Sequence, residues 1–168
     1  MRRSIGGFGI LVGAAMLCVG NFAQAGDVAL DKVPKVVLDA AQARFGEAKV
    51  KGAAHEKTPE GQEVYEVSLD QKGQNIDMTL TSEGAITLIE QQITRKELPK
   101  EVLATLDAKY PKSKYRIIES LIEVKDKEEK LSSYEVLLIT PQKQIRAIQL
   151  GLDGKIMKEE KKSTEDEE

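Results

Sequence analysis

The chain has 168 residues, with 25 Lys and Arg against 28 Asp and Glu, a formal net charge of −3, one histidine, one cysteine and no tryptophan. This length suits one ordinary domain or two very small ones. The acidic balance argues against nucleic acid as a partner, since nucleic-acid binding needs clustered positive charge.

Residues 1–25 have the features of an export signal. Arg2 and Arg3 precede an uncharged apolar run, Ile5 to Val19, and Ala23-Gln24-Ala25 fits the small-x-small rule of signal peptidase. The run is shorter than the roughly 20 apolar residues of a spanning helix. We predict a cleaved signal peptide, a periplasmic or secreted protein, and no stable membrane span after signal removal. An uncleaved membrane anchor is the alternative.

Cleavage would also change the chemistry available to the exported protein. Loss of Arg2 and Arg3 takes the formal charge from −3 to −5. Cys18, the only cysteine, leaves with the signal, so we expect no disulfide, thiol nucleophile or thiolate metal ligand. A lipoprotein would use Cys18, but the small residue usually found before a lipidated cysteine is missing.

Two stretches sixty-five positions apart share one pattern, Val33 to Val50 and Leu98 to Tyr115. In each, a proline follows an apolar residue, which suits the first turn of a helix. Apolar residues then recur at helical spacing, and a breaker follows the last one. The matching sets are Pro34, Val37, Leu38, Ala41, Phe45 and Gly46, and Pro99, Val102, Leu103, Leu106, Tyr110 and Pro111. We predict two copies of one amphipathic helix.

Alternating apolar and polar residues after each helix predict antiparallel strands with one buried face. Tyr134-Glu135-Val136 repeats Tyr65-Glu66-Val67, and the turn at Asp153-Gly154 repeats Glu83-Gly84. The expected fold class is α+β, with two tandem units, each one α-helix packed on a four-stranded antiparallel sheet. The expected domains are a signal peptide (1–25), a first repeat (26–94), a second repeat (95–160) and a charged disordered tail (161–168).

The order of these features resembles the PepSY-like family, also described as beta-lactamase-inhibitor-like. The shared order is Leu-Pro, amphipathic helix, Phe or Tyr, strand, Tyr-Glu-Val strand, polar turn, strand, Asp-Gly turn and final strand. The resemblance covers residues 33–92 and 98–160, and the first copy departs from it with Gly46 in place of a proline. It implies a non-enzymatic module of the bacterial cell envelope or exterior, since the family has no known catalytic residues.

The inventory of reactive side chains also indicates a protein that is not an enzyme. His55, the only histidine, lies in a polar, turn-like stretch and is expected to be an exposed loop residue. Glu66, Asp77 and Glu135 are expected on solvent faces of the sheets. We therefore predict no catalytic, cofactor-binding or metal-binding residues, and no cofactor.

Strands of the second repeat carry apolar residues on both faces. We single out Ile118, Ile122, Leu137 and Ile139 as a partner-binding face, which would contact another protein or a second protomer in a homodimer. The alternative is that the first repeat packs on this face and joins two small cores into one.

The leading functional hypothesis is an exported non-catalytic binding, inhibitory or regulatory module that recognises an unknown envelope or extracellular protein, such as a peptidase. A small-ligand or cell-wall sensing domain is the alternative, for which a concave apolar pocket would be expected. A hydrolase is disfavoured because no triad, metal set or pair of cleft carboxylates can be assembled.

Overall fold

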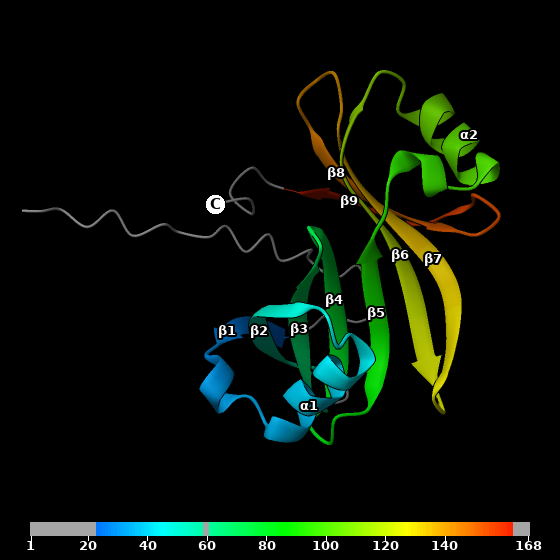
Figure 1. Ribbon diagram of the computed structural model, residues 1–168. Coiled ribbons are helices and arrows are strands. Elements are labelled where there is room, and N and C mark those ends of the chain that lie inside the picture. The colour runs from blue at the N-terminus through cyan, green and yellow to red at the C-terminus, as the bar shows by residue number, and fades with distance from the viewer. Residues whose placement is uncertain (1–22, 59–60, 163–168) are drawn as a thin grey trace, which may run out of the picture.

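The computed structural model of the chain describes residues 23–58 and 61–162. Within them lie nine strands, two α-helices and two short 3-10 helices (Figure 1). In chain order the elements are β1 (Ala23–Val28), η1 (Leu30–Lys32), α1 (Lys35–Arg44), β2 (Lys49–Lys57), β3 (Glu63–Gln71), β4 (Gln74–Thr81), β5 (Ile86–Gln92), η2 (Arg95–Glu97), α2 (Lys100–Lys109), β6 (Lys114–Lys125), β7 (Glu128–Ile139), β8 (Ile145–Gly151) and β9 (Ile156–Lys162).

Both predicted helices form, and both begin directly after a proline. Pro34 and Pro99 are the N-cap residues, where a fixed φ and a missing N–H cost nothing because the first helical N–H groups have no intrahelical partner. Each helix ends at an aromatic C-cap whose backbone N–H bonds back to the helix, Phe45 to the Ala41 carbonyl and Tyr110 to the Leu106 carbonyl.

The strands form one sheet, which corrects the predicted fold class. All nine described strands pair with their sequence neighbours, in the order β1 to β9, and every pairing is antiparallel. The prediction of two separate units, each with its own four-stranded sheet, is therefore wrong. The strands of the two predicted repeats meet where β5 pairs with β6, with Leu88 opposite Glu123 and Gln92 opposite Glu119.

Backbone hydrogen bonding explains why the two sheets join. A four-stranded sheet ending at β5 and another starting at β6 would each leave a row of unpaired N–H and C=O groups at an edge. Pairing β5 with β6 satisfies both rows. The alternation of side chains determines which residues point to each face of a strand, but it does not determine which strand lies beside it. The sequence pattern therefore fits one sheet and two sheets equally well.

The ends of the chain also differ from expectation. The predicted cleavage point after Ala25 falls inside β1, a strand that the sequence did not predict and that pairs with β2. The predicted tail begins at residue 161, yet Lys161 and Lys162 belong to β9. Residues 1–22 and 163–168, which hold most of the signal and tail predictions, lie outside the described residues.

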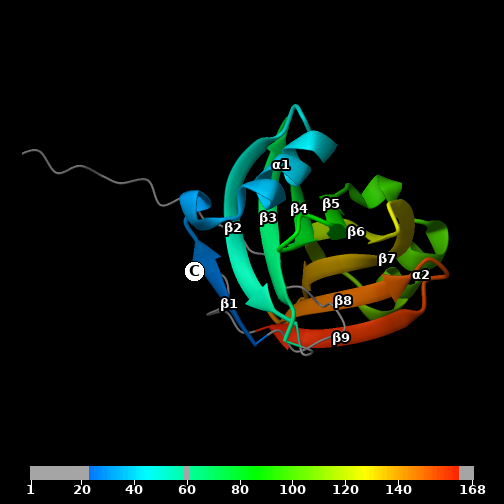
Figure 2. The same cartoon turned by 90° about the horizontal axis from the view of Figure 1, so that it is seen from below.

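Both helices pack on the same face of the sheet, called here the helix face. Val67, Met78, Ile89 and Ile122 stand in register across β3 to β6 under α1. Ile118, four residues before Ile122 on β6, packs under α2 with Val136 and Ile148. Figure 2 shows α1 beside β3 and β4, and α2 near β7 and β8. The other side of the sheet is called the opposite face.

Two glycine turns hold the helix starts against the sheet. Gly84, between β4 and β5, and Gly154, between β8 and β9, have φ of +82° and +79°. A Cβ on Gly84 would lie 2.8 Å from the Val36 carbonyl oxygen, and one on Gly154 would lie 2.5 Å from the Glu101 carbonyl oxygen. These turns require glycine both for backbone conformation and for close approach.

Candidate functional site

The four residues predicted as a partner-binding face do not share one face. Ile118 is buried in the cluster under α2, and Ile122 packs against the cluster under α1. Leu137 and Ile139 flank the buried Leu138 on β7, so they lie on the opposite face, and both are partly exposed. Only Leu137 and Ile139 remain together as candidates for partner contact.

The alternative reading of this apolar stretch is also corrected. We considered that the first repeat packs on the second repeat's outer face. The two halves instead meet edge to edge, through backbone pairing of Ile89 with Ile122 and Gln91 with Ser120. The second apolar face on β6 and β7 is therefore not an inter-repeat seam.

The most unexpected feature of the molecule is a set of buried carboxylates on the opposite face. Glu66, Asp77 and Glu135 were predicted to be solvated, but only 9%, 2% and 6% of their surfaces are exposed. Each of the strands β2 to β7 contributes one such side chain. We call this set the acidic row; it consists of Glu56, Glu66, Asp77, Glu90, Glu119 and Glu135.

Strand register brings these side chains together. Asp77 stands directly opposite Glu90, and Glu119 directly opposite Glu135. Glu66 pairs with Thr79, the next residue of β4 on the same face as Asp77. Neighbouring strands lie about 4.8 Å apart, so six strands spread the row over roughly 24 Å across the sheet. The row runs diagonally, because Glu56 pairs with Val64, two residues from Glu66, and Glu90 pairs with Leu121, two residues from Glu119.

Burial and mutual repulsion shift the acid–base equilibria of the row. Burial raises the pKa of Glu66 to about 8, helped by the negative charges of Asp77, Glu56 and Glu119. Burial raises the pKa of Glu119 to about 8 as well, helped by Asp77 and Glu135. Carboxyl groups with such pKa values are mostly protonated at pH 7.

Glu90 lies within the row and is its most strongly perturbed member. Burial raises its pKa well above the ordinary value, and the charges of Glu119, Glu66, Glu135 and Asp77 add to this effect. The side chain is 2% exposed, and its Oε1 atom has no hydrogen-bond partner among residues 23–58 and 61–162. A buried acceptor without a partner is destabilising, so this atom marks a place where the fold is not optimised for its own stability.

Asp77 differs from Glu90 because neighbouring side chains donate hydrogen bonds to both of its carboxylate oxygens. The Ser68 hydroxyl donates to Asp77 Oδ1 at 2.5 Å, and the Asn75 amide donates to Oδ2 at 2.5 Å. These hydrogen bonds lower the pKa of Asp77, but burial has the larger effect and the net pKa is raised. Among the described residues, Asp77 thus has neutral donors to both of its oxygens, whereas Glu90 Oε1 has none.

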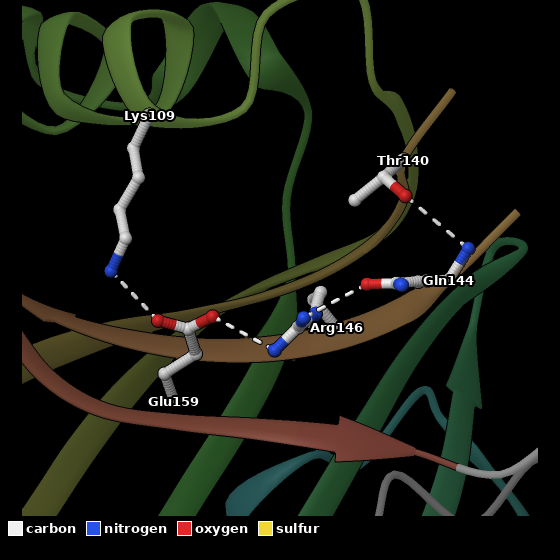
Figure 3. A network of polar contacts seen from close by, with 5 residues as sticks. All are labelled: Lys109, Thr140, Gln144, Arg146 and Glu159. Atoms are coloured by element: carbon white, nitrogen blue, oxygen red, sulfur yellow. Dashed lines mark hydrogen bonds and ion pairs between the residues drawn. The ribbon is translucent and has the colours of Figure 1, made fainter. Parts of the chain in front are cut away.

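Acids on the helix face, in contrast, have basic partners. Lys109 at the end of α2 donates to Glu159 Oε2 at 2.7 Å, and Arg146 donates to Glu159 Oε1 at 3.2 Å (Figure 3). Arg146 also donates to Gln144, whose backbone N–H donates to Thr140 Oγ1. This network ties α2 to β8 and β9 and leaves the pKa of Glu159 lowered.

A second ion pair on that side links α1 to the β6–β7 hairpin. Arg44 donates to both oxygens of Glu129, at 2.7 and 2.9 Å. These pairs are partly exposed and fully explained by their role in holding helices and hairpins in place. They do not form a candidate binding site.

His55 is not a loop residue, which corrects its prediction. It lies on β2, opposite Tyr65, with the two rings stacked at a centroid distance of 4.8 Å. Its Nε2 atom is 2.5 Å from Glu63 Oε2. Its register with Tyr65 places it on the helix face, away from Ser68 and Asp77, so these three residues do not form a catalytic triad.

The acidic row was not predicted from the sequence, because each acid alone looks like an ordinary polar-face residue. The available signal was one acid per predicted strand, and the strand register is needed to recognise it.

Among residues 23–58 and 61–162, no group of three or more His, Cys, Asp or Glu side chains is arranged to hold a metal ion. In the same residues, no helix is long and apolar enough to cross a membrane.

No family model and no curated protein matches this chain. Several solved structures share its fold. A protein of Bacteroides eggerthii assigned to the periplasm has 13% sequence identity and a TM-score of 0.60, over 77% of this chain and 88% of its own. A DUF2874 family protein of Bacteroides uniformis has 15% identity and a TM-score of 0.59, over 76% and 88%. A BLIP-like protein of Bacteroides fragilis has 13% identity and a TM-score of 0.53, over 76% and 84%.

These similarities establish the fold and support the beta-lactamase-inhibitor-like part of the resemblance at that level. The periplasmic assignment of the Bacteroides eggerthii protein agrees with the predicted periplasmic or secreted localisation of this chain. The PepSY description and the duplication remain predictions.

Proposed function

We propose that this protein is an exported, non-catalytic binding module of the bacterial cell envelope that recognises another protein through the opposite face of its sheet. The observation that carries this proposal is the placement of both helices on the helix face. Neither described helix covers the opposite face, which presents the partly exposed Leu137 and Ile139 and carries the buried acidic row beside them. Sheet faces and their hairpins are suited to protein recognition when a rigid scaffold supports them.

The arrangement of side chains favours binding over catalysis. A hydrolase needs a nucleophile or activated water beside a correctly oriented base. Ser68, the hydroxyl nearest to a row carboxylate, donates its proton to Asp77 in a buried hydrogen bond, and the only imidazole lies on the helix face. The fold neighbours support the same view, since they include a BLIP-like protein. Inhibition of a peptidase is one form that such binding could take.

Site-specific photo-crosslinking in the exporting cell tests the proposal. A photoreactive amino acid at position 137 should give a discrete crosslinked product whose second component mass spectrometry identifies, and a product of twice the protein's mass would identify a second copy as the occupant. The same residue at Val36, exposed on α1, serves as the comparison.

Affinity measurements with the identified partner complete the test. Leu137→Glu should weaken binding at least 10-fold, whereas Leu152→Glu, the same change at an exposed turn residue, should leave it unchanged. Crosslinking from position 36 but not from position 137 would show that the partner binds the helix face and would overturn the proposal.

A further inference from the structure

Five members of the acidic row lack the counter-charges that buried carboxylates normally have. No Lys, Arg or His among the described residues forms an ion pair with Glu56, Glu66, Asp77, Glu90 or Glu119. Proteins bury carboxylates without cations only at a cost in stability, and such groups concentrate at functional sites. Elsewhere in this molecule, acids such as Glu129 and Glu159 are paired.

Glu90 gives an independent indication that something is missing from the row. Its Oε1 atom is buried, lies among the other row carboxylates, and has no hydrogen-bond partner in the part of the chain that the structure describes. Two side-chain donors on the same face, Ser68 and Asn75, both donate to Asp77 and not to Glu90. A cationic donor brought by a ligand would satisfy Glu90 and neutralise its neighbours at once.

We propose that the acidic row binds a cationic segment of the partner protein, an extended stretch that carries several Lys or Arg side chains. The inference rests on the proposed function and adds the chemistry of the partner. Neither helix covers the opposite face, so a segment can reach the row without displacing α1 or α2. Because every row member is at most 9% exposed, the segment must displace the groups that bury these carboxylates. Across the strands the row spans roughly 24 Å, the length of about seven extended residues.

The shape of the row argues for a basic segment in preference to a metal ion. A calcium ion needs six to eight oxygen ligands within about 2.6 Å of one point. The row is instead a line of single carboxylates on successive strands, and no three acids of the described residues converge on one point. A line of acids matches a line of ammonium or guanidinium groups, and Arg can bond a carboxylate through two N–H donors.

The release of protons on binding distinguishes a cation bound in the row from one attracted to exposed acids on the protein surface. Glu66 and Glu119 have pKa values of about 8, so each is only about one-tenth ionised at pH 7. A cation favours the ionised form, and binding must therefore release protons from the row at pH 7. Exposed acids are already ionised at this pH, so binding to them releases none.

Isothermal titration calorimetry at pH 7 and low ionic strength tests the proposal. The probe is a capped heptapeptide of arginine, and the control is the same peptide in citrulline, which keeps the shape and removes the charge. Titrations in phosphate and in Tris, which differ in ionisation enthalpy, report the number of protons released. We expect the arginine peptide to bind with release of at least one proton, and the citrulline peptide not to bind.

Two variants locate the binding. Glu119→Gln should weaken the arginine peptide at least 10-fold and reduce the proton release, whereas Glu101→Gln, which removes an exposed carboxylate on α2, should change neither. Glu90→Gln is the second variant if Glu119→Gln does not fold by circular dichroism. Binding without proton release, or equal binding by Glu119→Gln, would overturn the proposal in favour of general electrostatic attraction.

Calcium chloride is titrated in parallel. Calcium binding that displaces the peptide and is lost in Glu119→Gln would overturn the proposal in favour of a metal site. If the peptide fails to bind while position 137 still crosslinks to a partner, the inference about the row falls and the proposed function stands.

Discussion

The acidic row predicts an unusual dependence of stability on pH. Most folded proteins are stabilised as the pH rises from 4 to 7, because their carboxylates are paired in the native state. Here Glu66 and Glu119 have folded pKa values of about 8, above the ordinary value of 4.5. Their contribution to stability is fully present below about pH 4.5 and is lost as the pH rises toward 8. We expect the protein to be most stable near pH 5.

The size of the effect follows from the same values. One pKa unit corresponds to about 1.4 kcal/mol, so a rise from 4.5 to about 8 corresponds to about 5 kcal/mol for one isolated group. Glu66, Glu90 and Glu119 repel one another, so their effects do not add as independent terms. We expect a total loss of about 2 to 5 kcal/mol between pH 5 and pH 8.5, a large part of a typical domain's stability.

Urea denaturation at half-unit steps between pH 4.5 and pH 9 measures this loss. Glu119→Gln removes one titrating group and keeps the side-chain shape. It should be within about 1 kcal/mol of wild type at pH 5 and more stable than wild type by about 1 to 3 kcal/mol at pH 8.5. Glu101→Gln should follow wild type at both values, because Glu101 is exposed. A free energy of unfolding that rises or stays level from pH 5 to pH 8.5 would refute the reasoning.

Three further predictions concern the scaffold. Gly154→Ala should cost about 2 kcal/mol or more of stability in a thermal melt, since its Cβ would clash with the Glu101 carbonyl. Gly73 also has a positive φ but has open space around it, so Gly73→Ala should cost about 1 kcal/mol. Equal losses would contradict the contact between Gly154 and Glu101. Arg44→Ala should cost less than about 1 kcal/mol, because its pair with Glu129 is partly exposed; a larger loss would show that this pair is integral to the fold. N-terminal sequencing of the exported protein should find Gly26 first, and a retained Met1 would contradict signal cleavage.

Local structure was largely predictable from the sequence. The two helices, their proline starts and the turns at Gly84 and Gly154 follow from side-chain periodicity and backbone chemistry, which act within a few residues. The pairing of β5 with β6 did not follow, because it joins backbone groups and depends on no particular side chain.

The candidate site was harder to predict for a related reason. Glu66 on β3 and Glu119 on β6 are fifty-three positions apart, and each directly follows an apolar residue, as a residue on a solvated face would. Only the register of the intervening strands shows that they belong to one row, and only the fold shows that they are buried. Leu137 and Ile139 do lie on a second face, as predicted, but Ile118 and Ile122 lie on the helix face. Successive residues of a strand point to opposite faces, so an error of one residue assigns a side chain to the wrong side of the sheet.

The most direct test of the account measures the ionisation of the row itself. Carbon-13 chemical shifts of the side-chain carboxyl groups, followed against pH, give the pKa values of Glu66 and Glu119 in the folded protein. We expect midpoints near pH 8 in the free protein, and lower midpoints when the arginine heptapeptide is bound. Midpoints near the ordinary value of 4.5 in the free protein would show that the row is solvated and would contradict the account.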